Sequence, residues 1–287
     1  MSDLRDLLRV EPGTLRLADV DPRATPGLPP KRVVGGDPKQ WSRTEVPAIS
    51  AELGSYQEKL FASAKEGHTR RRILLLLQAM DCGGKDGTVR GVTQGMSPAG
   101  LTVVGFGPPT EEERGHDFLW RIRRALPPTG YVGIFNRSQY EDVLVVRVHD
   151  LVSKDVWQRR YDEINAFEAE EAADGLTMVK VMLHISRAEQ KARLLDRLDD
   201  PTKNWKYNPG DLAERARWDD YQQAYQDALN RCSTDVAPWY VVPADRKWYR
   251  NWAVATLLRQ AFAEVDPRYP KPDFDVAEQR AELLAAK

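Results

Sequence analysis

The feature that most constrains the fold is an apolar strand pattern that ends in a glycine-rich turn. Residues 70–80, RRRILLLLQAM, are almost continuously apolar after a short basic start. Such a run is typical of a central strand covered by helices on both faces. The segment DCGGKDG follows at once and interrupts the run with three glycines. Residues 88–100, TVRGVTQGMSPAG, then predict a helix.

The alternation of strand and helix continues along the chain. Further strands are predicted at 101–106, 131–135, 176–185 and 238–244. Helices are predicted at 51–67, 88–100, 111–126, 153–175, 186–198, 214–231 and 245–265. This order predicts one α/β domain over residues 1–287, a three-layer α/β/α sandwich whose five-stranded sheet is mostly parallel.

The first part of the chain has a different character. Residues 1–45 show no sustained period, and Pro22, Pro26, Pro29 and Pro30 exclude a long helix there. We interpret this segment as an N-terminal arm that lies on the surface of the main domain. Disorder is the alternative.

Composition excludes several classes of protein. The net charge is −1, whereas proteins that coat nucleic acid carry a basic excess, so we expect local anion binding and no nucleic-acid partner. Cys82 and Cys232 form no CxxC pair, which argues against a disulfide framework or a zinc site. No apolar run reaches the ~20 residues of a membrane span, and the N-terminus lacks the order of a signal peptide. We therefore expect a cytoplasmic location and no membrane partner.

The glycine-rich turn has the features of a phosphate-binding loop. Glycines let backbone N–H groups approach phosphate oxygens, and Lys85 adds a full positive charge at the start of a helix. The standard pattern is GxxxxGK[ST], from which this chain departs at Ala79 and Asp86. Two carboxylates, Asp81 and Asp86, flank the lysine, which is coherent if Mg²⁺ is bound. The phosphate-binding candidates here are Gly83, Gly84, Lys85, Asp86, Gly87, Thr88 and Arg90. A turn without a ligand is the alternative.

A second polar cluster follows the third predicted strand. Because ligands bind beyond the carboxyl ends of parallel strands, this cluster should face the phosphate loop. We expect four residues to contribute to nucleotide or phosphate binding: Asn136, Arg137, Ser138 and Glu141. The cluster fits phosphoryl transfer, in which Arg137 would neutralise the charge on the oxygens of the transferred phosphoryl group. Glu141 or Asp142 would hold a metal. Ser138 and Glu141 could equally form a helix capping box, and both interpretations can hold together.

A basic excursion interrupts the αβ alternation near the end of the predicted sheet. Residues 196–211, DRLDDPTKNWKYNPGD, contain Arg197, Lys203 and Lys206 and are bounded by proline and glycine. We interpret about 197–225 as a lid that closes over phosphates and excludes water. A solvated loop with charges of both signs is the alternative.

Four segments together resemble polyphosphate kinase family 2. They are MDCGGKDGT, FGPPTEEERGHDFLWRI, FNRSQYEDVLVVRVH and DDPTKNWKYNPGDLAER, and the resemblance runs from about residue 40 to residue 269. It implies a P-loop kinase-like fold with a helical lid. It also implies transfer of a terminal phosphoryl group between inorganic polyphosphate and a nucleoside phosphate, with Mg²⁺ or Mn²⁺.

Several residue roles follow from this resemblance. Lys85 and the loop amides would hold the transferring phosphates, Asp81 would position metal and acceptor, and Arg137 matches the arginine of the family's second cluster. Lys85, Asp81 and Arg137 are therefore the catalytic candidates. The lid residues expected to contact the polyanion are Arg197, Lys203 and Lys206.

The second cluster departs from the pattern of many members. Asn136 stands where they have Asp, and Glu141 where they have Asn. An amide is a poorer metal ligand than a carboxylate, so Asp142 or Glu141 should join Asp81 at the metal. The NRSxYED form resembles subgroups that phosphorylate AMP, and in some cases ADP. Adenine nucleotides are the expected substrates, with guanine nucleotides as a further option.

Other functions remain alternatives at this stage. One is a nucleoside monophosphate kinase that uses ATP, and another is a regulatory module that binds nucleotide or polyphosphate. The four histidines are widely spread and lie outside both phosphate clusters, which favours direct transfer over a phosphohistidine. The arm and the long helices suggest a homo-oligomer, a dimer or a tetramer.

Overall fold

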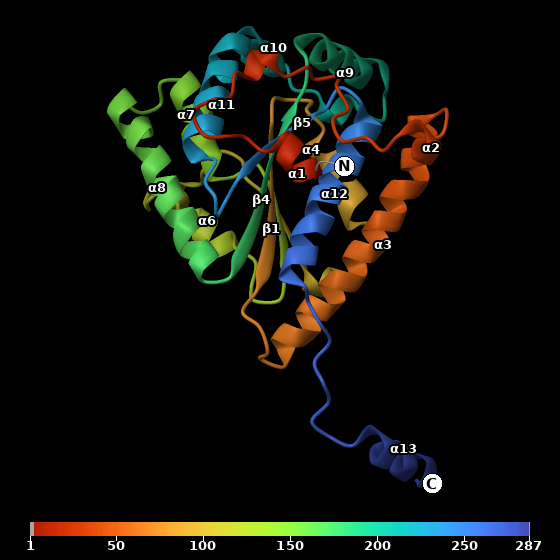
Figure 1. Ribbon diagram of the computed structural model, residues 1–287. Helices are drawn as coiled ribbons and strands as arrows, with labels where there is room; N and C mark the ends of the chain where they lie inside the picture. Colours follow the sequence, from red (N-terminus) through yellow and green to blue (C-terminus); the bar gives the residue numbers. More distant parts are fainter. Residues whose placement is uncertain (1–2, 287) are drawn as a thin grey trace.

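A five-stranded sheet forms the middle of three layers (Figure 1). The computed structural model describes residues 3–286. The strands are β1 (Arg72–Ala79), β2 (Leu101–Gly105), β3 (Val132–Asn136), β4 (Leu176–His184) and β5 (Trp239–Pro243). Their order in the sheet is β2-β3-β1-β4-β5, and every pair of neighbours is parallel. The predicted α/β fold with five strands is confirmed.

Helices cover both faces of this sheet. On one face lie α3 (Pro38–Lys65), α4 (Lys85–Thr93) and α12 (Lys247–Val265), which pack against one another. On the other lie α6 (Trp120–Ala125), α7 (Val145–Val148), α8 (Lys154–Ala173) and α11 (Trp218–Cys232). The remaining helices are α1 (Leu4–Leu8), α2 (Lys31–Val34), α5 (Glu111–Arg114), α9 (Arg187–Asp199), α10 (Asp211–Ala216) and α13 (Val276–Ala285). Every residue of β1 is buried, as expected of a strand covered on both sides.

The sheet order places two loops side by side. β1 lies between β3 and β4, and Leu77 of β1 is in register with Asn136 of β3. The two strands run in the same direction, so the chain leaves both at the same edge. The backbone N–H of Arg137 donates to the carbonyl oxygen of Leu77 at 3.0 Å, which joins the two exits. This contact fixes where the second cluster lies relative to the phosphate loop.

Two helices, α3 and α4, have boundaries that differ from those expected. α3 begins at Pro38, well before residue 51, because the Asp37 side chain accepts from the N–H groups of Lys39 and Gln40. The expected arm therefore ends earlier than residue 45. α4 runs over Lys85–Thr93 in place of 88–100.

The helix expected at 111–126 is two helices. A capping box between Thr110 and Glu113 starts α5, and Asp117 accepts from the N–H of Leu119 to start the turn that leads into α6. Gly115 ends α5 between these two starts.

The N-terminal segment runs along the β5 edge and onto the neighbouring helices. The N–H of Val10 donates to the carbonyl of Trp239 in β5 at 2.9 Å, and Arg9 forms a bridge with Tyr240. Further along, the N–H of Leu17 donates to the Gln226 side chain of α11 at 2.9 Å. Strand β5 is thus not left as an open edge.

No helix within residues 3–286 is both long enough and apolar enough to cross a membrane.

The segment between β4 and β5 contains the excursion and is built mainly of helices. α9 leads through turns and a 3₁₀ turn, η4 (Asn204–Lys206), into α10 and α11. In Figure 1, α9 and α10 stand at the top, above the strands. The excursion therefore overhangs the loops that follow β1 and β3.

A close contact between α3 and the turn that follows α4 leads to a stability prediction. A Cβ atom on Gly54 of α3 would lie 2.0 Å from the carbonyl oxygen of Gly95. We expect Gly54→Ala to lower the free energy of unfolding by about 1–3 kcal/mol, because overpacking outweighs the higher helix propensity of alanine. Thermal unfolding measures the change. Gly36→Ala is the control, since a Cβ there meets no atom within 4 Å. Equal melting temperatures for both variants would contradict the close contact between Gly54 and Gly95.

Candidate active site

The phosphate loop leaves β1 and turns into α4. Gly84 caps the helix with φ of 99°, a left-handed conformation that glycine adopts without strain. Lys85 follows at the first helical position and donates from Nζ to the carbonyl oxygen of Ala79 at 3.2 Å. Burial lowers the pKa of Lys85, and the nearby Arg137 charge lowers it further. An anion bound in the loop would stabilise the charged form of Lys85 and so oppose both effects.

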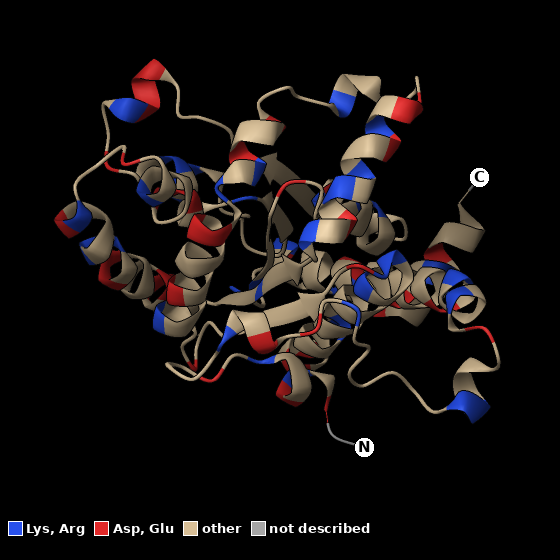
Figure 2. Cartoon of the chain, turned by 90° about the horizontal axis from the view of Figure 1, so that it is seen from above, with Lys and Arg blue, Asp and Glu red and all other residues tan. Residues whose placement is uncertain are grey.

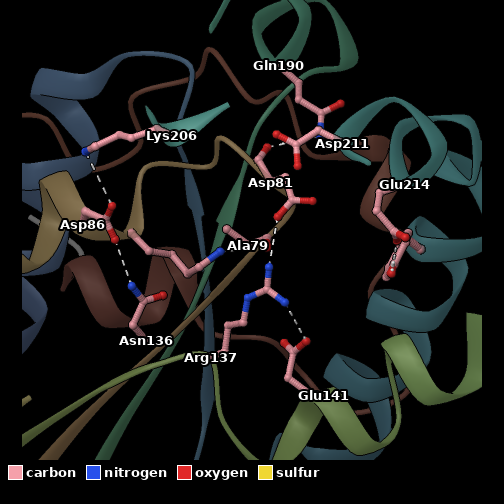
Figure 3. Close-up of polar contacts among 12 residues, drawn as sticks. Ala79, Asp81, Asp86, Asn136, Arg137, Glu141, Gln190, Lys206, Asp211 and Glu214 are labelled. Atoms are coloured by element: carbon pink, nitrogen blue, oxygen red, sulfur yellow. Dashed lines mark hydrogen bonds and ion pairs between the residues drawn. The ribbon is translucent and has the colours of Figure 1, made fainter. Parts of the chain in front are cut away.

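Arg137 connects the loop to the second cluster. Its guanidinium donates to Asp81 at 3.1 Å and to Glu141 at 3.2 Å (Figure 3). The Glu141 charge is the main cause that raises the pKa of Arg137, so this side chain stays charged. Asp81 comes from the loop after β1, and Glu141 lies in η3 (Gln139–Asp142) after β3. One side chain thus bridges two carboxylates from the two loops.

A second bridge involves the excursion. Asn136 Nδ2 donates to Asp86 Oδ1 at 2.9 Å, and Lys206 Nζ lies 3.8 Å from Asp86 Oδ2 (Figure 3). The loop, the second cluster and the excursion meet at Asp86. These three segments therefore lie close together, as the sequence predicts.

A cavity of about 550 Å³ lies between the loop and the excursion. Figure 2 looks onto this end of the molecule. Its basic lining residues are Lys85, Arg90, Arg137, Arg193, Arg197, Lys203, Lys206, Lys247 and Arg250. Its acidic lining residues are Asp81, Asp86 and Asp196. Gly83, Gly84, Gly87 and Asn136 also line it, so most of the predicted phosphate and lid residues share this basic cavity.

Sequence reasoning missed three of these basic residues: Arg193, Lys247 and Arg250. Arg193 of α9 donates from Nη1 to the carbonyl oxygens of Cys82 at 2.8 Å and Gly83 at 3.2 Å. Lys247 and Arg250 start α12 directly after β5. These two residues follow the carboxyl end of a predicted strand, where ligands bind in parallel sheets. The sequence could therefore have indicated them by the same rule that located the second cluster.

Arg250 is a buried cation under the phosphate loop. Only 3% of it is exposed, and Nη1 lies 3.4 Å from the carbonyl oxygen of Gly83. Burial lowers the pKa of Arg250 to about 9, and the charge of Arg193 contributes to this lowering. Among residues 3–286, no carboxylate forms an ion pair with it. Such a guanidinium is suited to an anion held in the loop.

Two further cavities adjoin the basic one. A largely apolar cavity of about 440 Å³ is lined by Pro108, Phe118, Val145 and other side chains. A second cavity, of about 360 Å³, is called the acidic cavity because four carboxylates line it: Asp81, Glu141, Asp211 and Glu214. Arg137 lines all three cavities. It therefore stands where a polyanion site, an acidic site and an apolar pocket meet.

Two candidate residues, Thr88 and Ser138, do not line the basic cavity. Thr88 is buried and its hydroxyl donates to the carbonyl oxygen of Gly84 at 3.2 Å. Ser138 is buried, and its Oγ accepts from Gln78 and from the N–H of Tyr140. Both side chains support the loops from below. The capping box between Ser138 and Glu141 is absent, because Glu141 turns to Arg137.

Asp142 does not join Asp81. Its carboxylate accepts from Arg160 at 3.1 Å and lies 3.7 Å from Arg121, at the apolar cavity. Burial raises the pKa of Asp142 despite these two arginines. The metal role of Asp142 stays a prediction, and the contacts of this carboxylate with two arginines outside the acidic cavity argue against it. Glu141, the alternative, lines the acidic cavity with Asp81, and Arg137 bonds to both carboxylates.

The acidic cavity fits a divalent cation that also binds phosphate. Burial and the neighbouring Asp81 charge raise the pKa of Asp211, which indicates crowded carboxylates. Within residues 3–286 no three metal-ligating side chains are clustered closely enough to form a complete site. Mg²⁺ usually takes one or two carboxylates and completes its shell with water and substrate phosphates. The donor set therefore suits Mg²⁺ brought together with a phosphate substrate.

Comparison with known proteins gives consistent matches. A family model described as Polyphosphate kinase 2 matches residues 40–270. The chain is 45% identical over 266 residues to an AMP/ADP-polyphosphate phosphotransferase of Meiothermus ruber, covering 92% of this chain and 95% of that protein. It is 41% identical over 254 residues to an ADP-polyphosphate phosphotransferase of Rhodopseudomonas palustris, covering 84% of each. The crystal structure of polyphosphate kinase 2 from Arthrobacter aurescens TC1 superimposes with a TM-score of 0.94 at 48% identity, covering 99% of this chain and 98% of that one.

The role of the buried Arg250 in anion binding can be tested by substitution. We expect Arg250→Met to leave the melting temperature of the free protein unchanged or higher, because it removes a buried charge that lacks a carboxylate partner. Tripolyphosphate should bind at least about 10-fold more weakly, since a charge-assisted hydrogen bond is lost. Calorimetry gives the affinity. Arg246→Met, which changes an exposed arginine one turn earlier, should bind as the wild type does. Equal affinities for all three proteins would remove Arg250 from the anion site.

Proposed function

The chain belongs to the polyphosphate kinase 2 family, and we propose that it transfers the terminal phosphoryl group of inorganic polyphosphate to AMP and to ADP, reversibly. The family assignment rests on a match over residues 40–270. The two nucleotide acceptors follow the name of the Meiothermus ruber relative, which spans nearly the same length.

One observation carries the proposal beyond the family match: Arg137 lines a basic, an acidic and an apolar cavity at once. The basic cavity suits a chain of phosphates. The apolar cavity suits a nucleoside, because base and ribose present large apolar surfaces with few polar groups. A phosphoryl group that passes between the two ligands would pass Arg137.

The proposed chemistry asks the protein mainly for positioning and charge neutralisation. Lys85 and Arg250 would hold the polyphosphate end against the loop amides. Arg137 would neutralise the equatorial oxygens of the transferring group, while Asp81 orients the acceptor phosphate beside it. The acceptor oxygen forms its bond to phosphorus as the bridging P–O bond of polyphosphate breaks, and the shortened polyphosphate carries away the electron pair.

A divalent cation, Mg²⁺ or Mn²⁺, belongs to this proposal. Asp81 would hold it in the acidic cavity, which Glu141, Asp211 and Glu214 also line. When bound, the cation would neutralise negative charge on the reacting phosphates. The carboxylates on their own repel phosphate, which is the reason to expect a metal here.

The excursion supports a lid. Arg197, Lys203 and Lys206 line the basic cavity from above, and Lys206 lies near Asp86 of the loop. Lys203 is also held by Asp200 at 2.8 Å within the excursion. We propose that a polyanion draws these side chains down, so that water is excluded during transfer.

The alternative of an ATP-dependent monophosphate kinase is not favoured, because the family is polyphosphate kinase 2 and the two relatives are named polyphosphate phosphotransferases. Direct transfer is preferred to a phosphohistidine, since no histidine of the described chain lines the basic or the acidic cavity. We also propose a homo-oligomer, because α13 buries none of its residues and exposes Leu283 and Leu284. Sedimentation of the purified protein tests that last proposal.

The function is tested with purified protein, Mg²⁺, long-chain polyphosphate and either AMP or ADP. Chromatography of the nucleotides should show ADP and ATP from AMP, and ATP from ADP. ATP from ADP alone would remove AMP as an acceptor. Turnover with ATP and AMP, but none with polyphosphate, would overturn the proposal in favour of the monophosphate kinase. Parallel reactions with GMP and GDP measure the preference for adenine.

Lys85→Met should lower kcat/KM for polyphosphate by about 10²–10³-fold, because a fixed charge that stabilises the transferring phosphates is lost. Circular dichroism should show an unchanged fold. Lys65→Met is the matched control, because Lys65 is an exposed lysine at the C-terminal end of α3 and does not line the basic cavity. The kinetics of this variant should equal those of the wild type. Near wild-type turnover by Lys85→Met would show that the loop does not hold the reacting phosphates.

A further inference from the structure

A charged pair lies deep behind the second cluster, away from all the cavities of the site. Lys180 is in the middle of β4 and Glu168 is on α8, and neither side chain is exposed to solvent. Lys180 Nζ lies 2.5 Å from Glu168 Oε2 and also donates to the carbonyl oxygen of Cys232 at 2.7 Å. Neither residue lines the basic, acidic or apolar cavity. Contact with a substrate therefore does not explain their presence.

The pair is tied directly to the loop that carries Arg137 and Glu141. Glu168 Oε1 accepts from Gln139 Nε2 at 2.9 Å and from the Tyr140 hydroxyl at 2.8 Å. Lys180 Nζ donates to the same hydroxyl at 2.9 Å. Gln139 and Tyr140 are buried and stand between Arg137 and Glu141 in sequence. Each tether is a hydrogen bond to a charged group, which is the stronger kind.

The backbone at Arg137 needs such support. Its φ is 67°, in the left-handed region that residues with a side chain rarely adopt. A strained residue of this kind persists only where its surroundings over-determine it. On one side, the Arg137 N–H is held by the carbonyl oxygen of Leu77. On the other side, Ser138 is held by Gln78, and Gln139 and Tyr140 are held by Glu168.

Stability alone is a weak reason for this pair. Replacing a buried ion pair with apolar side chains is often neutral or stabilising, because taking both charges out of water is costly. Here the pair also supplies acceptors and a donor at fixed positions under a strained turn. We propose that Glu168 and Lys180 are positioning residues for the phosphoryl-transfer site, which hold Arg137 and Glu141 in place through Gln139 and Tyr140. This inference rests on the proposed function.

Two double variants separate positioning from stability. Glu168→Gln/Lys180→Met removes the ion pair but keeps an oxygen that accepts from Gln139 and Tyr140. Glu168→Leu/Lys180→Met removes the ion pair and the acceptor. With polyphosphate and ADP, the leucine variant should have kcat at least about 10-fold below that of the glutamine variant, because a small displacement of a catalytic group is costly. KM for polyphosphate should stay within about 3-fold, since Lys85, Arg250 and the lid are untouched.

A matched control lies one turn further along α8. Glu171 forms an ion pair with Arg72 at 2.7 Å, and both residues are also largely buried, but at the opposite end of β1 from the site. Arg72→Met/Glu171→Leu should change the melting temperature without changing kcat. Equal kcat values for the leucine and glutamine variants, both folded, would overturn the inference. So would a loss of kcat in the control that follows its loss of stability.

A second variant covers the case in which the leucine variant does not fold. Gln139→Met/Tyr140→Phe leaves the buried pair intact and cuts the tethers from the loop side. Its kcat should fall at least about 5-fold, again with little change in KM. Unchanged kcat would overturn the inference on its own. Absence of polyphosphate turnover by the wild type would instead contradict the proposed function, so the two failures are distinguishable.

Discussion

The guanidinium of Arg137 lies between the carboxylates of Asp81 and Glu141, and the arrangement of the site depends on this interaction. It exists because β1 and β3 are parallel neighbours whose loops leave the sheet at the same edge. A sheet with another strand between them would separate the charges and divide the site. In the absence of substrate the two carboxylates more than neutralise the single guanidinium charge. A phosphate that arrives at Arg137 competes with two carboxylates, which suits a transient contact better than a permanent one.

The distribution of charge is local. The chain carries a net charge of −1, yet the cavity beneath the excursion collects mostly basic side chains. Two of these cations, Lys85 and Arg250, contact backbone carbonyl oxygens and form no ion pair with a carboxylate of residues 3–286. Lys85 Nζ donates to the carbonyl oxygen of Ala79 at 3.2 Å, and Arg250 Nη1 lies 3.4 Å from that of Gly83. Carbonyl dipoles hold a guanidinium in place while leaving its charge available to an anion. The cavity is thus organised before the polyanion arrives, which lowers the reorganisation that binding requires.

Much of this organisation is local in sequence and could be predicted. The apolar run before Lys85 and the polar cluster at Arg137 each mark the end of a buried strand, and parallel-sheet geometry brings such ends together. The contributions of Arg193 and of the pair Glu168 and Lys180 could not be predicted this way. They come from helix faces and from a strand interior, where the partner is more than ten residues away and only packing decides which side chain it meets. A lysine inside an apolar strand was the visible sign that something buried had to neutralise it.

The N-terminal segment has a consequence for how the chain assembles during synthesis. Val10 and Arg9 contact Trp239 and Tyr240, so this segment is synthesised long before the strand that it contacts. Strand β5 completes the sheet, and only then does its outer edge meet the segment that covers it. The N-terminal segment therefore covers the edge of the last strand of the sheet to be synthesised. Until β5 pairs, the β4 side of the growing sheet is an unpaired edge, and such edges are the part of a nascent chain most exposed to pairing with a neighbour.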